Sequence, residues 1–217
     1  SCHSGAMASP LVTGRSRVHL ELEQTLLQWL DAPTGHACLL FSSGFAANTG
    51  VLRALFNDKS GHALLFQDKL NHASLLDAGL VCQALRHVRQ LRFGHNDIAH
   101  LSKLLLSKKA TERKSLVVTE GVFSMDGDTP DLNRLNAVTK EQAVPWMLDD
   151  AHGIGILGAE GQGSLNANGL SLDDCDIYIM TFGKAIGAQG AAVIARQDII
   201  DYLINFSKEY IYSTHLA

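Results

Sequence analysis

The residue of this chain best suited to chemistry is a lysine between two glycines, Lys184 in the run Thr-Phe-Gly-Lys-Ala-Ile-Gly at positions 181–187. Residues 176–180 before it are mostly apolar and predict a short buried strand. Because burying an ammonium charge is unfavourable, we expect the pKa of Lys184 to lie below its ordinary value. Such a lysine can form a Schiff base with an aldehyde, and Gly183 and Gly187 leave room for a bulky group beside it. The alternative is a lysine that only extends its charge from a strand end into water.

A second polar group, Asp149, Asp150 and His152, follows another apolar run at 144–148. This run predicts a parallel strand, and ligands of open α/β sheets bind at the carboxyl ends of such strands. A carboxylate there suits the protonated ring nitrogen of pyridoxal phosphate, a role open to Asp149, and His152 could hydrogen-bond the phenolic oxygen. Strand alternation should send Asp150 the other way. A capping turn and a His–Asp metal pair are the alternatives, although no third ligand lies at the usual short spacing.

Composition limits the classes of protein to which the chain can belong. It has 217 residues, 46% of them hydrophobic, which is enough for a sizeable core, and a net charge of −4 that gives no basic surface for nucleic acid. Its four cysteines form no CxxC pair, so we expect a reduced, cytoplasmic setting rather than a disulfide framework. No apolar run approaches the length of a membrane-spanning helix.

Strand candidates alternate with amphipathic helices along the chain, which is typical of an α/β domain with a mostly parallel sheet. The expected strands lie at residues 37–41, 63–66, 115–119, 144–148, 176–180 and 190–195. The expected helices lie at 18–30, 45–56, 97–107, 131–140 and 197–206. The strand at 190–195 should pair beside the strand that ends at the lysine, and one domain is the economical interpretation.

The lysine and aspartate motifs together resemble those of the α-oxoamine synthases, fold-type-I pyridoxal phosphate enzymes that condense an amino acid with an acyl-CoA. Further segments are similar to motifs of this family in the same order along the chain: SSGFAAN at 42–48, DKLNHAS at 68–74, EGVFSMDGD at 120–128 and YIYST at 210–214. The resemblance runs from about residue 12 to residue 217. Within the family, the motifs look most like those of the biotin-pathway branch.

The resemblance implies roles for four residues in the chemistry. Lys184 would carry pyridoxal phosphate, Asp149 would contact the ring nitrogen, and His152 would bond the phenolic oxygen. His72 would stack on the pyridine face and line the acyl-CoA side. For His72 the alternative is a helix-capping or core histidine.

The resemblance also implies contacts to the rest of the cofactor. Gly44 and Phe45 would offer backbone N–H groups to the phosphate at a helix start, where the dipole favours an anion, and Thr181 would touch it through its hydroxyl. Ser124 would bond the phenolic oxygen or a ring substituent. Thr214 would reach the phosphate of the other subunit, in a homodimer with shared sites. The alternatives are an ordinary helix start for Gly44 and Phe45 and a turn-capping serine for Ser124.

The family likeness implies that residues 1–217 form the cofactor-binding large domain of a longer enzyme, without an N-terminal arm and a small C-terminal domain. The implied reaction joins L-alanine to pimeloyl-CoA, or its carrier-protein equivalent, with loss of CoA and CO2. Sibling enzymes that make 5-aminolevulinate, 2-amino-3-ketobutyrate or sphingoid bases share this core. A non-catalytic subunit of the same fold is another alternative, although such subunits usually lack the lysine. A metal-dependent hydrolase built on His72, Asp149 and His152 would leave Lys184 unexplained.

Overall fold

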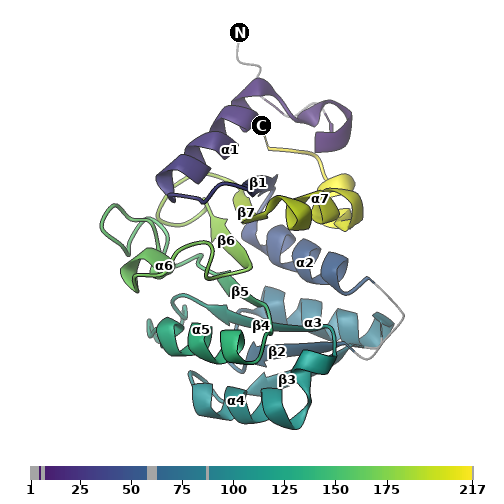
Figure 1. Ribbon diagram of the computed structural model, residues 1–217. Coiled ribbons are helices and arrows are strands. Elements are labelled where there is room, and N and C mark those ends of the chain that lie inside the picture. Colours follow the sequence, from purple (N-terminus) through teal and green to yellow (C-terminus); the bar gives the residue numbers. More distant parts are fainter. Residues whose placement is uncertain (1–4, 6–7, 58–62, 87, 217) are drawn as a thin grey trace.

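A single twisted sheet organises the molecule (Figure 1). The computed structural model describes residues 5, 8–57, 63–86 and 88–216. Within these residues the sheet has seven strands in the order β1-β7-β6-β5-β4-β2-β3. The strands from β6 to β3 in this order run parallel, and β7 is antiparallel to both of its neighbours. Their bounds are β1 His36–Phe41, β2 Leu64–Asp68, β3 Arg89–Phe93, β4 Ser115–Glu120, β5 Trp146–Asp149, β6 Ile177–Thr181 and β7 Ala191–Arg196.

Helices cover both faces of the sheet. One face buries apolar side chains against α2, α3, α7 and α8, and the other against α1, α4, α5 and α6. The bounds are α1 Arg17–Trp29, α2 Gly44–Leu55, α3 Ala73–Arg86, α4 Ile98–Ser107, α5 Leu132–Glu141, α6 Ser164–Ala167, α7 Gln197–Phe206 and α8 Lys208–Ile211. A π-helical turn spans Pro10–Gly14 and a 3₁₀ turn spans Ala110–Glu112.

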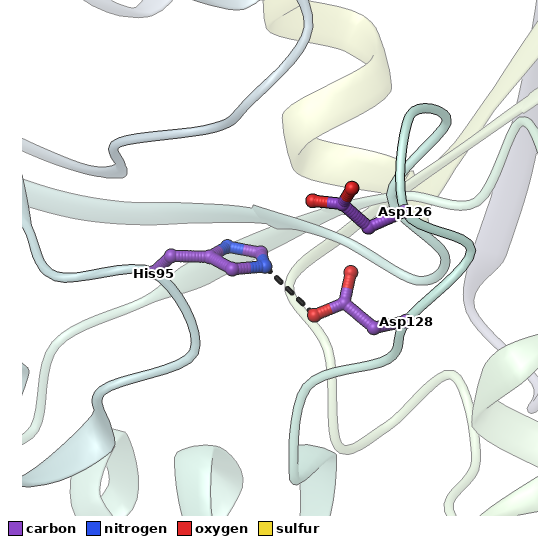
Figure 2. Close-up of side chains that lie close together, drawn as sticks. All are labelled: His95, Asp126 and Asp128. Atoms are coloured by element: carbon purple, nitrogen blue, oxygen red, sulfur yellow. Dashed lines mark hydrogen bonds and ion pairs between the residues drawn. The ribbon is translucent and has the colours of Figure 1, made fainter.

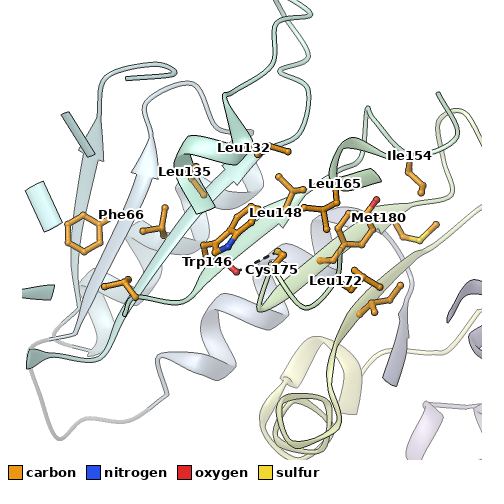
Figure 3. Packing of buried hydrophobic residues seen from close by; sticks show 14 of the residues in the cluster. Phe66, Leu132, Leu135, Trp146, Leu148, Ile154, Leu165, Leu172, Cys175 and Met180 are labelled. Atoms are coloured by element: carbon orange, nitrogen blue, oxygen red, sulfur yellow. Dashed lines mark hydrogen bonds between the residues drawn. The ribbon is translucent and has the colours of Figure 1, made fainter. Parts of the chain in front are cut away.

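The alternation of side chains along each strand decides which face a residue serves. In β5, Trp146 and Leu148 pack with Leu132 and Leu165 on one face (Figure 3), whereas Met147 lies in the opposite cluster, with residues of α2 and α3. Asp149 has the same parity as Met147. Its side chain is therefore directed to the α2 and α3 side of the sheet.

The expected α/β fold with a mostly parallel sheet is confirmed. Each predicted strand and helix is present with ends within two residues of those expected, and the strand at 190–195 is β7, which pairs with β6. Asp97 caps α4 by accepting a hydrogen bond from the backbone N–H of His100. The sequence interpretation missed α3 and β3. The strand β3 is an edge strand with two arginines and a glutamine, so it lacks the apolar run that identified the others.

Among the described residues, no helix combines the length and hydropathy needed to cross a membrane.

Candidate active site

The carboxyl ends of β4, β5 and β6 place three polar residues side by side. Glu120 is paired with Asp149 in the sheet register, and β6 follows on the other side of β5 and ends at Thr181. Glu120, Asp149 and Thr181 each lie an even number of positions from strand residues that pack against α2 and α3. Their side chains therefore point to the same face of the sheet and lie under the start of α2. A cavity opens at this point, lined by Gly44, Phe45, Asn48, His72, Ser74, Glu120, Asp149, Ala151, Thr181 and Lys184.

The first turn of α2 forms one wall of the cavity. Ser43 caps the helix by accepting a hydrogen bond from the N–H of Ala46 at 3.1 Å. A Cβ built on Gly44 would lie 3.5 Å from both Cβ and Oγ1 of Thr181, so the helix start faces the threonine hydroxyl across a narrow space. First-turn N–H groups have no acceptor within their own helix, and they lie at the positive end of its dipole. This arrangement suits an anion such as a phosphate group.

Lys184 lies in a turn directly after β6. The turn closes through hydrogen bonds from Gly187 N to Lys184 O and from Ala188 N to Phe182 O, and Gly187 has a φ of +73° that favours glycine. The amine Nζ is 2.7 Å from Nε2 of His152. Partial burial lowers the pKa of Lys184, although the charges of Asp149 and Glu120 oppose this shift. The lowered lysine pKa expected from the sequence is confirmed.

The same contact shapes His152. Burial, followed by the nearby charge of Lys184, lowers the pKa of its imidazole. A neutral imidazole can accept a proton from the amine at Nε2, so the pair can exchange a proton across this hydrogen bond.

The two neighbouring aspartates point in opposite directions, as the sequence predicted. Asp149 lines the cavity, and its carboxylate accepts hydrogen bonds from Nδ2 of Asn48 at 2.6 Å and from the N–H of Ala151 at 3.1 Å. Asp150 is fully buried away from it and accepts from Ser164 N at 2.6 Å, Ser164 Oγ at 2.5 Å and Tyr178 OH at 2.7 Å. Asp149 is therefore the carboxylate available to a ligand, and Asp150 holds the loop after β5.

Glycines make the burial of Asp150 possible. A Cβ at Gly121, Gly153 or Gly163 would lie 2.1, 2.1 or 2.2 Å from an oxygen of its carboxylate. Only glycine fits at these three positions without displacing the acid.

Glu120 is a site residue that the sequence interpretation missed. It is 3% exposed and lines the cavity, and its carboxylate accepts a hydrogen bond from the backbone N–H of His72. Burial, and then repulsion from Asp149, raise the pKa of Glu120 to about 8, against the opposing effects of the His72 N–H and Lys184. The glutamate opens the segment EGVFSMDGD, but only the adjacency of β4 and β5 brings it beside the aspartate.

His72 lies between β2 and α3 and reaches the cavity. Its Nδ1 is 2.8 Å from Oγ of Ser74 and also accepts a hydrogen bond from the backbone N–H of Ser74 at 3.2 Å. Ser74 and Asn48, which both line the cavity, were also missed by the sequence interpretation.

Three predicted site residues are not among those that line the cavity: Ser124, Thr214 and His152, of which His152 contacts the lining residue Lys184. Ser124 is exposed on the turn after β4, next to Met125, which is 91% exposed. Thr214 is exposed on the segment after α8, which is tied to the start of the chain by a hydrogen bond from His215 N to Ala8 O. Their roles toward a cofactor stay predictions.

A cluster outside the cavity has the residue types of a metal site. Within the described residues, the potential ligand atoms of His95, Asp126 and Asp128 are the only such group within 4.8 Å of one another (Figure 2). His95, however, has Nδ1 3.0 Å from Asp68 and Nε2 2.7 Å from Asp128. Burial alone would lower the pKa of His95, but the hydrogen bonds and charges of the two aspartates raise it. Both ring nitrogens of His95 thus already have an aspartate partner, and the cluster joins β2 to the loop after β4.

Among the described residues, His72, Asp149 and His152 do not place three ligand atoms within 4.8 Å of one another. His152 is directed at the lysine amine, and His72 is directed at Ser74. The metal-dependent hydrolase that the sequence left as an alternative therefore has no ligand set here.

Comparison with known proteins agrees with this geometry. Residues 4–217 match the family described as aminotransferase class I and II. The chain belongs to this family. The match confirms the fold type and the pyridoxal phosphate cofactor that the motifs predicted, and the relatives described next confirm the likeness to the biotin-pathway branch.

Two curated relatives share one name. The chain is 46% identical over 215 residues to the 8-amino-7-oxononanoate synthase of Aeromonas hydrophila, with 98% of this chain and 50% of that protein covered. It is 49% identical over 212 residues to that of Aliivibrio salmonicida, with 97% of this chain and 51% of that protein covered. The chain thus spans about half the length of the curated relatives it matches.

Solved structures of two related enzymes superpose on the chain. Serine palmitoyltransferase from S. paucimobilis, with bound pyridoxal phosphate and myriocin, gives a TM-score of 0.86 at 31% identity, covering 98% of this chain and 52% of that one. The 8-amino-7-oxononanoate synthase of Francisella tularensis gives 0.77 at 31% identity, covering 93% and 55%.

Proposed function

We propose that the chain is the cofactor-binding large domain of an α-oxoamine synthase of the 8-amino-7-oxononanoate type. The reaction joins L-alanine to pimeloyl-CoA, or to the same acyl group on a carrier protein, and gives 8-amino-7-oxononanoate, CoA and CO2. The observation that carries the proposal is the cavity in which a lysine of lowered pKa, Lys184, meets a carboxylate, Asp149, beside the start of α2.

The residues of the cavity fit pyridoxal phosphate group by group. The first turn of α2 at Gly44 and Phe45, with the hydroxyl of Thr181 opposite, offers donors to a phosphate. Asp149 offers a carboxylate to a protonated ring nitrogen, and Lys184 offers the amine that bonds an aldehyde. When bound, the cofactor supplies an electron-withdrawing ring that stabilises negative charge at Cα of the amino acid.

Lys184, His152 and Asp149 can then accept, donate or hold the protons that the reaction moves. Because the pKa of Lys184 is lowered, its Nζ is more often uncharged than that of an exposed lysine, which suits both attachment to an aldehyde and removal of a proton from Cα. His152, 2.7 Å away, is placed to take up or return a proton at its Nε2. Asp149 accepts a hydrogen bond on each of its two oxygens, from Asn48 and from the N–H of Ala151, and these bonds hold its carboxylate in place toward a protonated ring nitrogen.

The test is to load the purified chain with pyridoxal phosphate, add L-alanine and pimeloyl-CoA, and measure release of CoA with a thiol reagent. Substrate-dependent CoA release that is lost in Lys184→Ala, with the fold of the variant unchanged by circular dichroism, is the expected result. A chain that binds the cofactor yet releases CoA at the same rate with and without L-alanine would contradict the proposed reaction.

A sibling reaction with serine and a long-chain acyl-CoA is the second candidate. It is favoured by the higher TM-score to serine palmitoyltransferase, 0.86 against 0.77, whereas the curated relatives at 46–49% identity favour the alanine reaction. A panel of glycine, alanine and serine against short and long acyl-CoAs separates the two. We expect alanine with pimeloyl-CoA to give the highest kcat/KM.

The proposal includes a cytoplasmic homodimer. It is supported by the exposed side chain of Thr214 and by the exposed apolar residues near it and at the cavity mouth, Tyr212 (78%) and Phe45 (54%). Ser124 and Thr214 would complete the cofactor site, Thr214 from the second subunit.

A further inference from the structure

A continuous chain of hydrogen bonds, buried at its Asp149 end, links Asp149 to His72 through Asn48 and Ser74. Nδ2 of Asn48 donates to Oδ2 of Asp149 at 2.6 Å and to Oγ of Ser74 at 3.0 Å. Oγ of Ser74 is in turn 2.8 Å from Nδ1 of His72. Asn48, Ser74 and Asp149 are 2%, 0% and 5% exposed, so water does not compete for the two bonds that Asn48 donates, whereas His72 is exposed at the other end of the chain of bonds.

The position of each hydrogen in this chain follows from its partners. A carboxylate only accepts, so the amide of Asn48 must turn its NH₂ group toward Asp149, and the second N–H then reaches Ser74. Oδ1 of Asn48 is buried with no donor among the described residues, which shows that the contacts of Nδ2 set the orientation of the amide.

The histidine end is fixed in the same way. The backbone N–H of Ser74 points at Nδ1 of His72, so this ring nitrogen accepts, and the hydroxyl of Ser74 donates to it as well. The ring proton must therefore be on Nε2. A single tautomer and a single ring orientation result.

We propose that Asn48 and Ser74 are positioning residues that hold the carboxylate of Asp149 and the ring of His72 as one unit. This inference rests on the proposed function, in which these two side chains contact the ring nitrogen and the face of the cofactor. The unit is built before any cofactor arrives, because every bond in it lies within the protein. Asn48 lies in α2, Ser74 at the start of α3 and Asp149 at the end of β5, so the hydrogen bonds also connect these three elements at the floor of the cavity.

The loop after β5 provides a matched control. Ser164 is also a buried serine, 1% exposed, whose hydroxyl bonds the neighbouring aspartate, Asp150. It does not line the cavity, and its hydrogen bonds are to Asp150 and Asn168. Ser74→Ala and Ser164→Ala thus remove the same group at the same depth, one inside the proposed unit and one outside it.

The first measurement uses the cofactor-free chain. ¹⁵N-detected NMR of the histidine rings, with the His72 signals assigned by comparison with His72→Gln, should show an unprotonated Nδ1 and a protonated Nε2 at neutral pH. Ser74→Ala should move the Nδ1 signal, and Asn48→Ala should move it too although Asn48 does not touch the ring. Ser164→Ala should leave it in place. A protonated Nδ1 in the native chain, or equal shifts in Ser74→Ala and Ser164→Ala, would overturn the proposal.

The second measurement is the dissociation constant for pyridoxal phosphate. Loss of about one buried hydrogen bond of this kind should raise it roughly tenfold in Asn48→Ala or Ser74→Ala. Because the two residues act as one unit, the double variant should also lose about tenfold rather than about a hundredfold. Additive losses, or a loss of the same size in Ser164→Ala, would contradict the unit. If the native chain does not bind the cofactor at all, the proposed function is refuted. The NMR measurement, which needs no cofactor, still tests whether Asn48 and Ser74 position His72.

Discussion

Replacing Glu120 by Gln should flatten the pH dependence of stability of the cofactor-free protein. Glutamine keeps the volume of the side chain and an oxygen that can accept from the N–H of His72, but it cannot ionise. The pKa of Glu120 is raised from 4.5 to about 8, chiefly by burial and then by Asp149. The substitution therefore removes the titration of the Glu120 carboxyl and changes little else.

The size of the effect follows from linkage. Because the folded protein holds the proton of Glu120 more tightly than the unfolded chain, the stabilisation is complete below pH 4.5 and is lost as the pH rises toward 8. Each pH unit in this window costs about 1.4 kcal/mol of unfolding free energy, on the order of 5 kcal/mol in all and about 2 kcal/mol between pH 6.5 and 8. Asp150, whose pKa is raised to about 6, makes most of its own change below this narrower range.

Urea unfolding of both proteins at pH 6.5, 7.25 and 8 measures this. The free energy of Glu120→Gln minus that of the native protein should rise by about 2 kcal/mol across the series, since other titrations are common to both and cancel. Parallel pH profiles would show that Glu120 is ionised in the folded protein at pH 6.5, and the account of its burial beside Asp149 would be refuted.

The two aspartates should separate function from stability. Asp150→Ala leaves the buried donors of Ser164 and Tyr178 without an acceptor, which should lower the unfolding free energy in urea by roughly 3–5 kcal/mol. The folded fraction of this variant should still bind the cofactor. Asp149→Ala should instead lose cofactor affinity at a smaller cost in stability. Equal effects in both assays would show that the register of the strand end has been misassigned. Mixing inactive Lys184→Ala with inactive Thr214→Ala should restore about one good site per mixed dimer, and a monomer in sedimentation or no recovery of activity would refute the shared site.

The sequence predicted those parts of the site that depend on local order. Lys184, Asp149 and Thr181 could be placed because each follows or ends an apolar strand, and the carboxyl ends of parallel strands are where ligands bind. Gly44 and Phe45 could be placed because the segment SSGFAAN resembles the family's phosphate-side loop, which opens a helix, and the structure has a helix start at this position. The opposite directions of Asp149 and Asp150 followed from strand alternation.

The sequence interpretation missed Glu120, Asn48 and Ser74 because their roles depend on contacts with residues far away in the sequence. Glu120 matters because β4 lies beside β5, and a single sequence does not state which strands are neighbours. Asn48 and Ser74 matter because α2 and the start of α3 cross the end of β5 together. Thr214 is exposed in a single chain, so its predicted role depends on a second copy.

The central claim is that Lys184 carries the cofactor, and one measurement tests it most directly. The chain is incubated with pyridoxal phosphate, reduced with borohydride, digested and analysed by mass spectrometry. The account predicts the phosphopyridoxyl group on the peptide that contains residues 181–187, because Lys184 in this peptide has a lowered pKa and lines the cavity beside Asp149. Label on any other lysine, or none in a correctly folded protein, would contradict it.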